Sequence, residues 1–163
     1  MNNYQLNTNW CLWYHSINNN EWNKSSYKNL LTLRNIYDLK LMNDTIDKIH
    51  LQNGMFFIMR EDIFPTWEDP DNREGCCISF KISSHILKDQ WNYIVERILT
   101  EDILKDTDKV NLLNGISIAP KKEFNIVKIW LRKHDQNYTE WLKEYEPNFT
   151  KEKALIKKHE LSD

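Results

Sequence analysis

The chain has few of the residues that build cofactor loops or stabilise small folds by cross-linking. It holds three glycines and three cysteines in 163 residues. Isolated at Gly54, Gly75 and Gly115, the glycines cannot form a glycine-rich phosphate loop. The cysteines are too few and too poorly spaced for a disulfide framework or a four-ligand zinc site, and the histidines are scattered. We therefore expect no metal and no cofactor.

The sequence also lacks a long apolar run and an excess of positive charge. No apolar stretch approaches the ~20 residues that a membrane helix needs, and the first residues have no signal-peptide character. We therefore expect a cytosolic or nuclear protein without a membrane partner, and we predict a cytoplasmic location. The formal net charge is -2, so no global positive field exists to hold a long polyanion. Any contact with nucleic acid should be local.

What the chain does have is enough apolar material for one core. Hydrophobic residues make up 40% of it, and a chain of this length buries roughly two thirds of its unfolded surface. We expect a single domain over residues 1–163, and a monomer.

Segments rich in β-branched and aromatic residues alternate with segments of helical spacing, which predicts a mixed α and β fold. The predicted strands are Trp10–His15, Met55–Arg60, Cys76–Ile82, Gly115–Ala119, Asn125–Leu131 and, at the end of the chain, Ala154–His159. The predicted helices cover the segments from Leu33 to Ile46, from Ile86 to Leu99 and from Tyr138 to Tyr145. Helices should cover one face of a mainly antiparallel sheet.

Two of the seven tryptophans lie outside these elements. Trp22 belongs to the polar stretch Asn18–Lys24, and Trp67 precedes the turn-prone stretch Glu68–Gly75. A tryptophan is usually a core residue, yet neither local pattern offers a core face to receive one. Each is therefore a candidate platform for a flat ligand.

The order of the aromatic motifs resembles the translation initiation factor 4E family over almost the entire chain. Pro65–Asp69 (PTWED) looks like the family's Pro-x-Trp-Glu-Asp segment, and Trp10–Trp13 (WCLW) is similar to its opening strand. Trp22, Trp91 and Trp130 fall at further family positions. The resemblance implies an α+β fold: a curved, mainly antiparallel sheet, with about three helices on its convex face and the ligand on the concave side.

The resemblance also implies that the ligand is the 7-methylguanosine cap of mRNA, with 7-methyl-GTP as its small analogue, and that no reaction is catalysed. Trp22 and Trp67 would sandwich the methylated base, whose positive charge favours stacking between electron-rich rings. Glu68 would accept hydrogen bonds from the guanine N1–H and amino group. Trp130 resembles the residue beside the N7-methyl group; a buried strand tryptophan is its alternative role.

The cap phosphates need cations, and here the chain departs from the family. Lys121, with Lys122 beside it, replaces a phosphate-binding arginine, and lysine cannot make arginine's bidentate fork. A phosphate-binding lysine of the family is replaced by Ile126. Because side chains alternate along a strand, Lys128 shares the face of Ile126 and is the expected substitute.

The family also receives a helical Tyr-x-x-x-x-Leu peptide from scaffold or repressor proteins. The resemblance places this docking surface at Leu33, Tyr37, Asn92 and Glu96, where Asn92 and Glu96 stand at normally apolar positions. These departures favour a divergent partner. The chain could support translation initiation or repress it by occupying caps; an enzyme that processes capped or free nucleotides is disfavoured by the lack of a glycine-rich loop and of clustered carboxylates.

Overall fold

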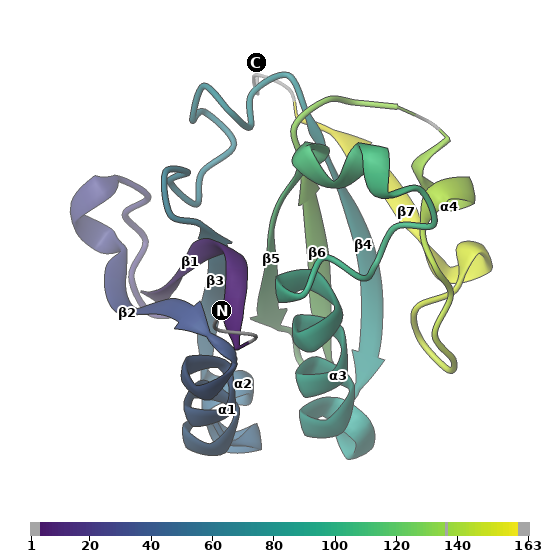
Figure 1. Cartoon of the computed structure of the whole chain (residues 1–163). Helices are drawn as coiled ribbons and strands as arrows, with labels where there is room; N and C mark the ends of the chain where they lie inside the picture. The colour runs from purple at the N-terminus through teal and green to yellow at the C-terminus, as the bar shows by residue number, and fades with distance from the viewer. Residues whose placement is uncertain (1–3, 136, 160–163) are drawn as a thin grey trace.

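An antiparallel sheet of seven strands runs through residues 4–135 and 137–159, which the computed structural model describes (Figure 1). The strands lie in the order β2-β1-β3-β5-β6-β4-β7. Their bounds are β1 (Gln5–Ser16), β2 (Lys28–Asn35), β3 (Gly54–Arg60), β4 (Cys76–Ser83), β5 (Leu113–Pro120), β6 (Phe124–Leu131) and β7 (Leu155–Lys158). The curved sheet and the mixed α+β class confirm the predicted fold.

Because successive side chains of a strand point to opposite faces, the sheet has two apolar faces, and each face packs into its own cluster of buried residues. On β3, Phe56 and Ile58 belong to the main core, whereas Phe57 and Met59 belong to a smaller cluster on the other face. On β6, Ile129 and Leu131 likewise belong to the main core, whereas Trp130 between them lies on the face of the smaller cluster. The smaller cluster is aromatic and only partly covered, and it is the face that bears the candidate site.

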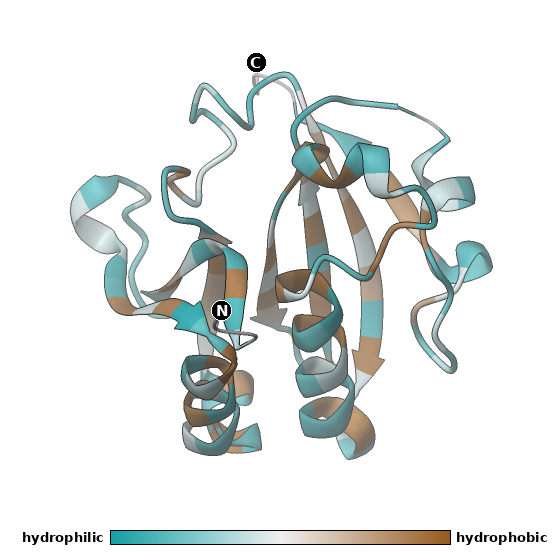
Figure 2. Cartoon of the chain, viewed as in Figure 1, coloured by the Kyte–Doolittle hydropathy of each residue, from teal (hydrophilic) through white to brown (hydrophobic). Residues whose placement is uncertain are grey.

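Three helices cover the main core: α1 (Ile36–Thr45), α2 (Lys48–Asn53) and α3 (Leu87–Leu99) (Figures 1 and 2). The Asn35 side chain caps α1 by accepting a hydrogen bond of 2.9 Å from the backbone N–H of Asp38. On α3, Trp91 is almost fully buried, and Lys88 donates to backbone carbonyls at the end of α1. No helix in the described part of the chain is long and apolar enough to cross a membrane.

Three sequence-based boundaries are wrong. The segment from Leu33 onward was expected to be helical, but Leu33 lies on β2 and is fully buried. The short helix α2, which begins after its N-cap residue Asp47, lies beyond the predicted helix and was not expected. The third predicted helix is a single turn, α4 (Tyr138–Trp141), which lies near β7 and away from the other helices (Figure 1).

Candidate functional site

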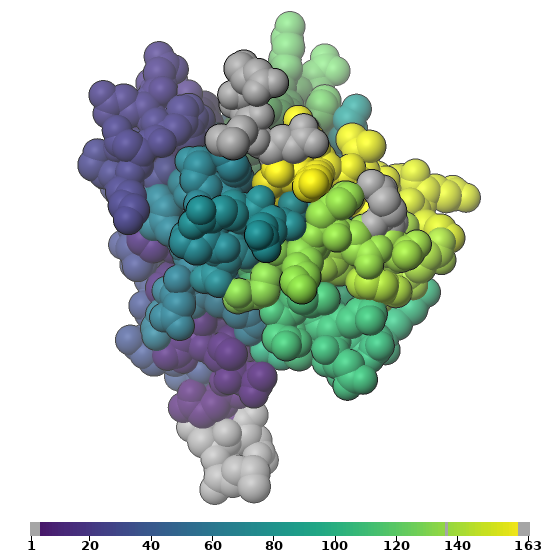
Figure 3. All heavy atoms as spheres, turned by 90° about the horizontal axis from the view of Figure 1, so that it is seen from above, coloured from purple at the N-terminus to yellow at the C-terminus, as the bar shows by residue number. Residues whose placement is uncertain are grey.

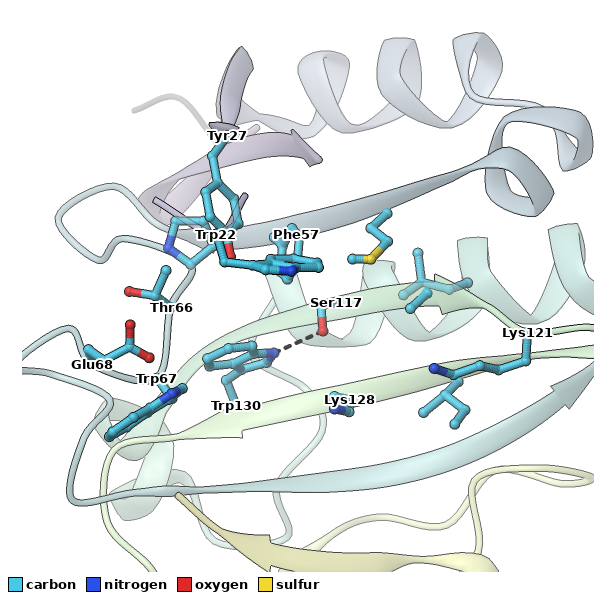
Figure 4. Close-up of a pocket in the computed structure, with 15 residues that line it drawn as sticks. Trp22, Tyr27, Phe57, Thr66, Trp67, Glu68, Ser117, Lys121, Lys128 and Trp130 are labelled. Atoms are coloured by element: carbon cyan, nitrogen blue, oxygen red, sulfur yellow. Dashed lines mark hydrogen bonds between the residues drawn. The ribbon is translucent and has the colours of Figure 1, made fainter. Parts of the chain in front are cut away.

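A pocket of about 440 Å³ opens on the face of the sheet that the helices leave uncovered (Figure 4). Its walls come from two loops: Trp22 from the β1–β2 connection and Trp67 from the β3–β4 connection. Its floor comes from the sheet and includes Phe57 on β3, Ser117 on β5 and Trp130 on β6. Loops carried on a rigid sheet are a common way to hold a binding site.

Trp22 is held by a residue that the motif comparison did not single out. Its ring stacks on the ring of His15, with centroids 3.9 Å apart and planes 4° from parallel. His15 is fully buried, and its two ring nitrogens lie 2.8 Å from the carbonyl oxygens of Ser16 and Glu21. These contacts fix the imidazole plane, and the imidazole in turn orients Trp22. Trp22 remains 54% exposed, which leaves ring surface for a ligand.

Trp67 is positioned by hydrogen bonds within its own loop. The Asp69 carboxylate accepts from the backbone N–H of Phe64 at 3.0 Å and from that of Asp71 at 2.9 Å. The buried Asn72 amide donates to the carbonyls of Phe64 and Thr66 at 3.1 and 2.8 Å. The loop is therefore ordered by side chains that point inward, and Trp67 faces the pocket.

Glu68 and Asp69 are neighbours in sequence with different surroundings. Glu68 lines the pocket, whereas Asp69 is used inside the loop. Within residues 4–135 and 137–159, no hydrogen bond or ion pair engages the Glu68 carboxylate. Burial, and secondarily the charge of Glu68, raises the pKa of Tyr27 to about 12, so Tyr27 stays neutral beside it. The pocket thus contains one carboxylate that is available to a donor-rich ligand.

Trp130 forms the floor and is 7% exposed. Its indole Nε1 donates to Ser117 Oγ at 2.9 Å, so its polar atom already has a partner. The ring of Phe57 meets it edge-on, with centroids 6.4 Å apart. Trp130 therefore offers a ligand its apolar surface.

Of the three lysines expected to bind phosphates, the structure brings two to the pocket. Lys121 and Lys128 line it together with Ile126, and Lys122 does not. Figure 4 shows Lys121 and Glu68 at opposite ends of the site, with Lys128 between them along the floor. In the described part of the chain neither Lys121 nor Lys128 forms an ion pair. Lys122 lies next to Lys121 in the sequence but outside the lining of this pocket.

The residues expected to dock a partner lie on the helix side of the sheet. Tyr37 on α1 is 61% exposed and contacts Tyr4, with ring centroids 5.2 Å apart. On α3, Glu96 is exposed and Asn92 is half-buried. Leu33 is buried and cannot belong to this surface, whereas Leu41, one turn after Tyr37 on α1, is 58% exposed.

Sequence reasoning missed His15, Tyr27, Phe57 and Ser117 as site residues. Alternation along Met55–Arg60 places Phe57 on one face but does not say which face holds the site. Ser117 meets Trp130 through the pairing of β5 with β6, which no local pattern encodes. Within residues 4–135 and 137–159, no group of three potential metal-ligating side chains gathers.

The family model described as eukaryotic initiation factor 4E matches residues 5–153, nearly the whole chain. The chain belongs to the eukaryotic initiation factor 4E family. A eukaryotic translation initiation factor 4E homolog of Acanthamoeba polyphaga mimivirus is 30% identical over 107 residues, which cover 57% of this chain and 39% of that protein. The chain thus matches less than half of the length of this factor 4E relative.

Solved factor 4E structures share the fold. Factor 4E-3 of Ascaris suum in complex with the m7G cap superposes with a TM-score of 0.72 at 18% identity, over 83% of this chain and 77% of the other. Factor 4E of a schistosome, in complex with m7GpppA and a 4E-binding protein, superposes with a TM-score of 0.73 at 15% identity; the match covers 83% of this chain and 75% of the schistosome chain. Factor 4E-3 of C. elegans, in complex with the 4E-binding protein Mextli, superposes with a TM-score of 0.71 at 18% identity; the match covers 80% of this chain and 76% of the C. elegans chain. At these identities the likeness concerns the factor 4E fold.

Proposed function

We propose that the chain binds the 7-methylguanosine cap of mRNA between Trp22 and Trp67, as a non-catalytic protein without a cofactor that supports translation initiation. The observation that carries the proposal is the composition of one pocket. Two tryptophans from separate loops form its walls, a carboxylate lies beside one of them, and two lysines lie farther along; none of these three charged groups forms an ion pair within residues 4–135 and 137–159. The factor 4E relatives bound to caps support the same ligand class.

Each part of the pocket matches one part of the cap. Methylation at N7 makes the guanine cationic, and a cationic ring between two indoles gains stacking and cation–π attraction. Glu68 accepts from the guanine N1–H and amino group, which adenine cannot imitate. Lys121 and Lys128 receive the phosphates as point charges. Trp130 packs beside the methyl group.

The test is binding of 7-methyl-GTP and GTP, followed by quenching of tryptophan fluorescence. We expect 7-methyl-GTP to bind far more tightly, because only its base is cationic. Trp22→Leu and Trp67→Leu should each weaken binding by roughly tenfold or more, since a base–aromatic stack contributes ~1–3 kcal/mol.

Tyr37→Leu is the matched control. It removes an exposed aromatic ring from α1, outside the pocket, and should leave the affinity for 7-methyl-GTP unchanged. Equal affinity of the unaltered protein for GTP and 7-methyl-GTP would contradict the sandwich.

The helix side supports a second binding event, docking of a helical Tyr-x-x-x-x-Leu type peptide. Tyr37 and Leu41 form an exposed apolar strip on α1, and an amphipathic helix buries such strips. Asn92 and Glu96 add polar groups on α3, which favours a partner with matching polar residues. Relatives in complex with 4E-binding proteins support this class of partner.

A further inference from the structure

The wall of the pocket that Trp22 forms stands on a loop with open space beside it. Figure 3 shows this β1–β2 connection, in dark violet-blue, at the rim of the molecule next to the β3–β4 loop, in teal. A hollow of about 310 Å³ lies between the two loops, bordered by Trp22 on one side and by Glu68 on the other. Trp22 is therefore open toward the β3–β4 loop, and its support comes from β1.

His15, the residue before the last of β1, holds Trp22 at two points. Its Nε2 lies 2.8 Å from the carbonyl oxygen of Glu21, which belongs to the peptide group that joins Glu21 to Trp22. Its ring stacks on the indole, and this is the one parallel stack among the aromatic pairs of the described residues. His15 itself is fully buried and does not line the pocket, so it acts on a ligand through Trp22.

The two hydrogen bonds of His15 indicate how many protons its ring carries. Both partners, the carbonyl oxygens of Ser16 and Glu21, lie at 2.8 Å and can only accept. A neutral imidazole has one N–H, so it donates to one carbonyl and turns a lone pair toward the other. The imidazolium has two N–H groups and satisfies both. The geometry therefore fits the doubly protonated ring.

The two carbonyls are held in place by hydrogen bonds within the loop. Asn19 makes two of these bonds: its backbone N–H donates to the Ser16 carbonyl at 3.3 Å, and its Oδ1 accepts from the backbone N–H of Glu21 at 2.9 Å. Because the loop resists turning a carbonyl away, a His15 ring that lost one proton would tilt instead. A tilted ring no longer matches the plane of the indole, so the loss of the proton would release Trp22.

No carboxylate holds the proton on His15. Tyr27 meets the ring edge-on, with centroids 4.9 Å apart, and burial, together with the charge of Glu68, raises the pKa of Tyr27 to about 12, so Tyr27 is neutral. The other titratable groups of this connection and of the start of β2 are exposed: Glu21, Lys24 and Lys28. Where β3 pairs with His15 it presents no titratable side chain. Two carbonyl oxygens and the electron-rich face of Trp22 thus stabilise the positive ring.

We propose that His15 positions Trp22 for the cap as a doubly protonated imidazolium, so that 7-methyl-GTP binds more weakly once His15 loses one proton. The proposal rests on the proposed cap-binding function and adds a pH-dependent positioning residue to it. A wall that is already in place loses less freedom when the ligand binds. The cationic base on the free face of Trp22 does not reverse this effect, because Glu68 and the phosphates of the ligand balance its charge.

The first measurement is the affinity for 7-methyl-GTP from about pH 5 to pH 8, the range in which imidazoles titrate. It compares the unaltered protein with His15→Phe, which keeps an aromatic ring against Trp22 but neither donates a hydrogen bond nor titrates. At the acid end the variant should bind about three- to tenfold more weakly, the effect of losing about one hydrogen bond. The difference should shrink as the pH rises. The ligand titrates equally in both experiments, so the ratio of the two affinities reports on His15.

Nitrogen-15 NMR of the His15 ring in the unaltered protein is a second measurement and needs no variant. At the acid end of the range both ring nitrogens should have the chemical shifts of N–H groups. Bound 7-methyl-GTP should move the midpoint of this titration to higher pH, because a ligand that binds the protonated form better also stabilises that form. Repulsion between the imidazolium and the cationic base would move the midpoint to lower pH.

His85→Phe is the matched control. His85 is exposed just before α3 and outside the pocket, so this variant should follow the unaltered protein at every pH. Thermal melts check that His15→Phe is folded.

The two proposals fail in different ways. If the unaltered protein binds no 7-methyl-GTP at any pH, the cap-binding function fails, and the role of His15 in it fails too. If the ligand binds but the affinity ratio to His15→Phe is the same at every pH, the His15 proposal alone is overturned. It is also overturned if the bound ligand moves the His15 midpoint to lower pH, or if one ring nitrogen lacks its proton throughout the range.

Discussion

Glu68 and Asp69 show how two adjacent carboxylates can serve different purposes. Asp69 uses both oxygens to accept backbone N–H groups inside the β3–β4 loop. Glu68 keeps its carboxylate toward the pocket. A substitution at either residue could reduce ligand binding, but only one of them should do so with the fold intact.

Glu68→Gln should weaken 7-methyl-GTP binding by about tenfold and leave the melting temperature unchanged. The amide places a donor against the donors of guanine and loses charge assistance, and hydrogen bonds to charged groups contribute ~1.5–3 kcal/mol. Asp69→Asn should instead lower the melting temperature, because the amide offers one acceptor where two N–H groups need one each. Titrations and thermal melts of both variants check this. Loss of binding in Asp69→Asn at a normal melting temperature would contradict the assignment.

At the scale of elements, the β3–β4 loop ends at Gly75, which packs directly against the backbone of β6 just before β4 begins. A Cβ atom added to Gly75 would lie 1.8 Å from the backbone carbonyl oxygen of Leu131 on β6. Gly75 also donates its N–H to the Asn72 carbonyl at 2.8 Å. The backbones approach so closely here that only glycine fits.

Gly75→Ala should therefore destabilise the protein by about 1–3 kcal/mol or more, the cost of forcing atoms into a filled site. Urea unfolding measures the loss. Gly54→Ala is the control, because its nearest neighbour is the Tyr14 ring, a side chain that can turn away. An equal loss in both variants would show that the collision with Leu131 is not the cause.

Strand positions were predictable from the sequence wherever both faces of a strand are apolar. Cys76–Ile82 and Asn125–Leu131 match β4 and β6 closely for this reason. The segment Lys28–Asn35 was missed, because this edge strand, half of whose residues are exposed, shows no clear alternation, and its Leu33 falls near helical spacing with Tyr37. The motif predicted that the tryptophans and Glu68 belong to one site, and they line one pocket. His15 and Ser117 were not predicted, because their roles depend on tertiary contacts with Trp22 and Trp130.

At the scale of the whole molecule, acid should weaken the fold through His159. Its ring packs near Trp130, with centroids 5.3 Å apart, and its folded pKa of about 4 is below the unfolded value of about 6.5. Between these values the unfolded chain binds more protons than the folded one, so stability falls as the pH drops from about 6.5 to about 4. Below about 4 both states are protonated and this contribution no longer changes.

Replacing His159 isolates its contribution to the pH dependence of the free energy of unfolding. His159→Gln should show a shallower decline of unfolding free energy across the same pH window, measured by urea unfolding at several pH values. The carboxylates contribute equally in both proteins, so the difference between the two curves reports on His159. Parallel curves would mean that the imidazole is not buried in its neutral form.

The burial of all three cysteines has a practical consequence for studying the loops. Cys11, Cys76 and Cys77 are free and inaccessible, and burial raises the pKa of the Cys76 thiol to about 11. A thiol reagent needs an exposed thiolate, so the folded protein presents it with no rapid target. A single new cysteine at the exposed position Asn20, near Trp22, could therefore carry a fluorescent or spin label without removing any native residue of the core.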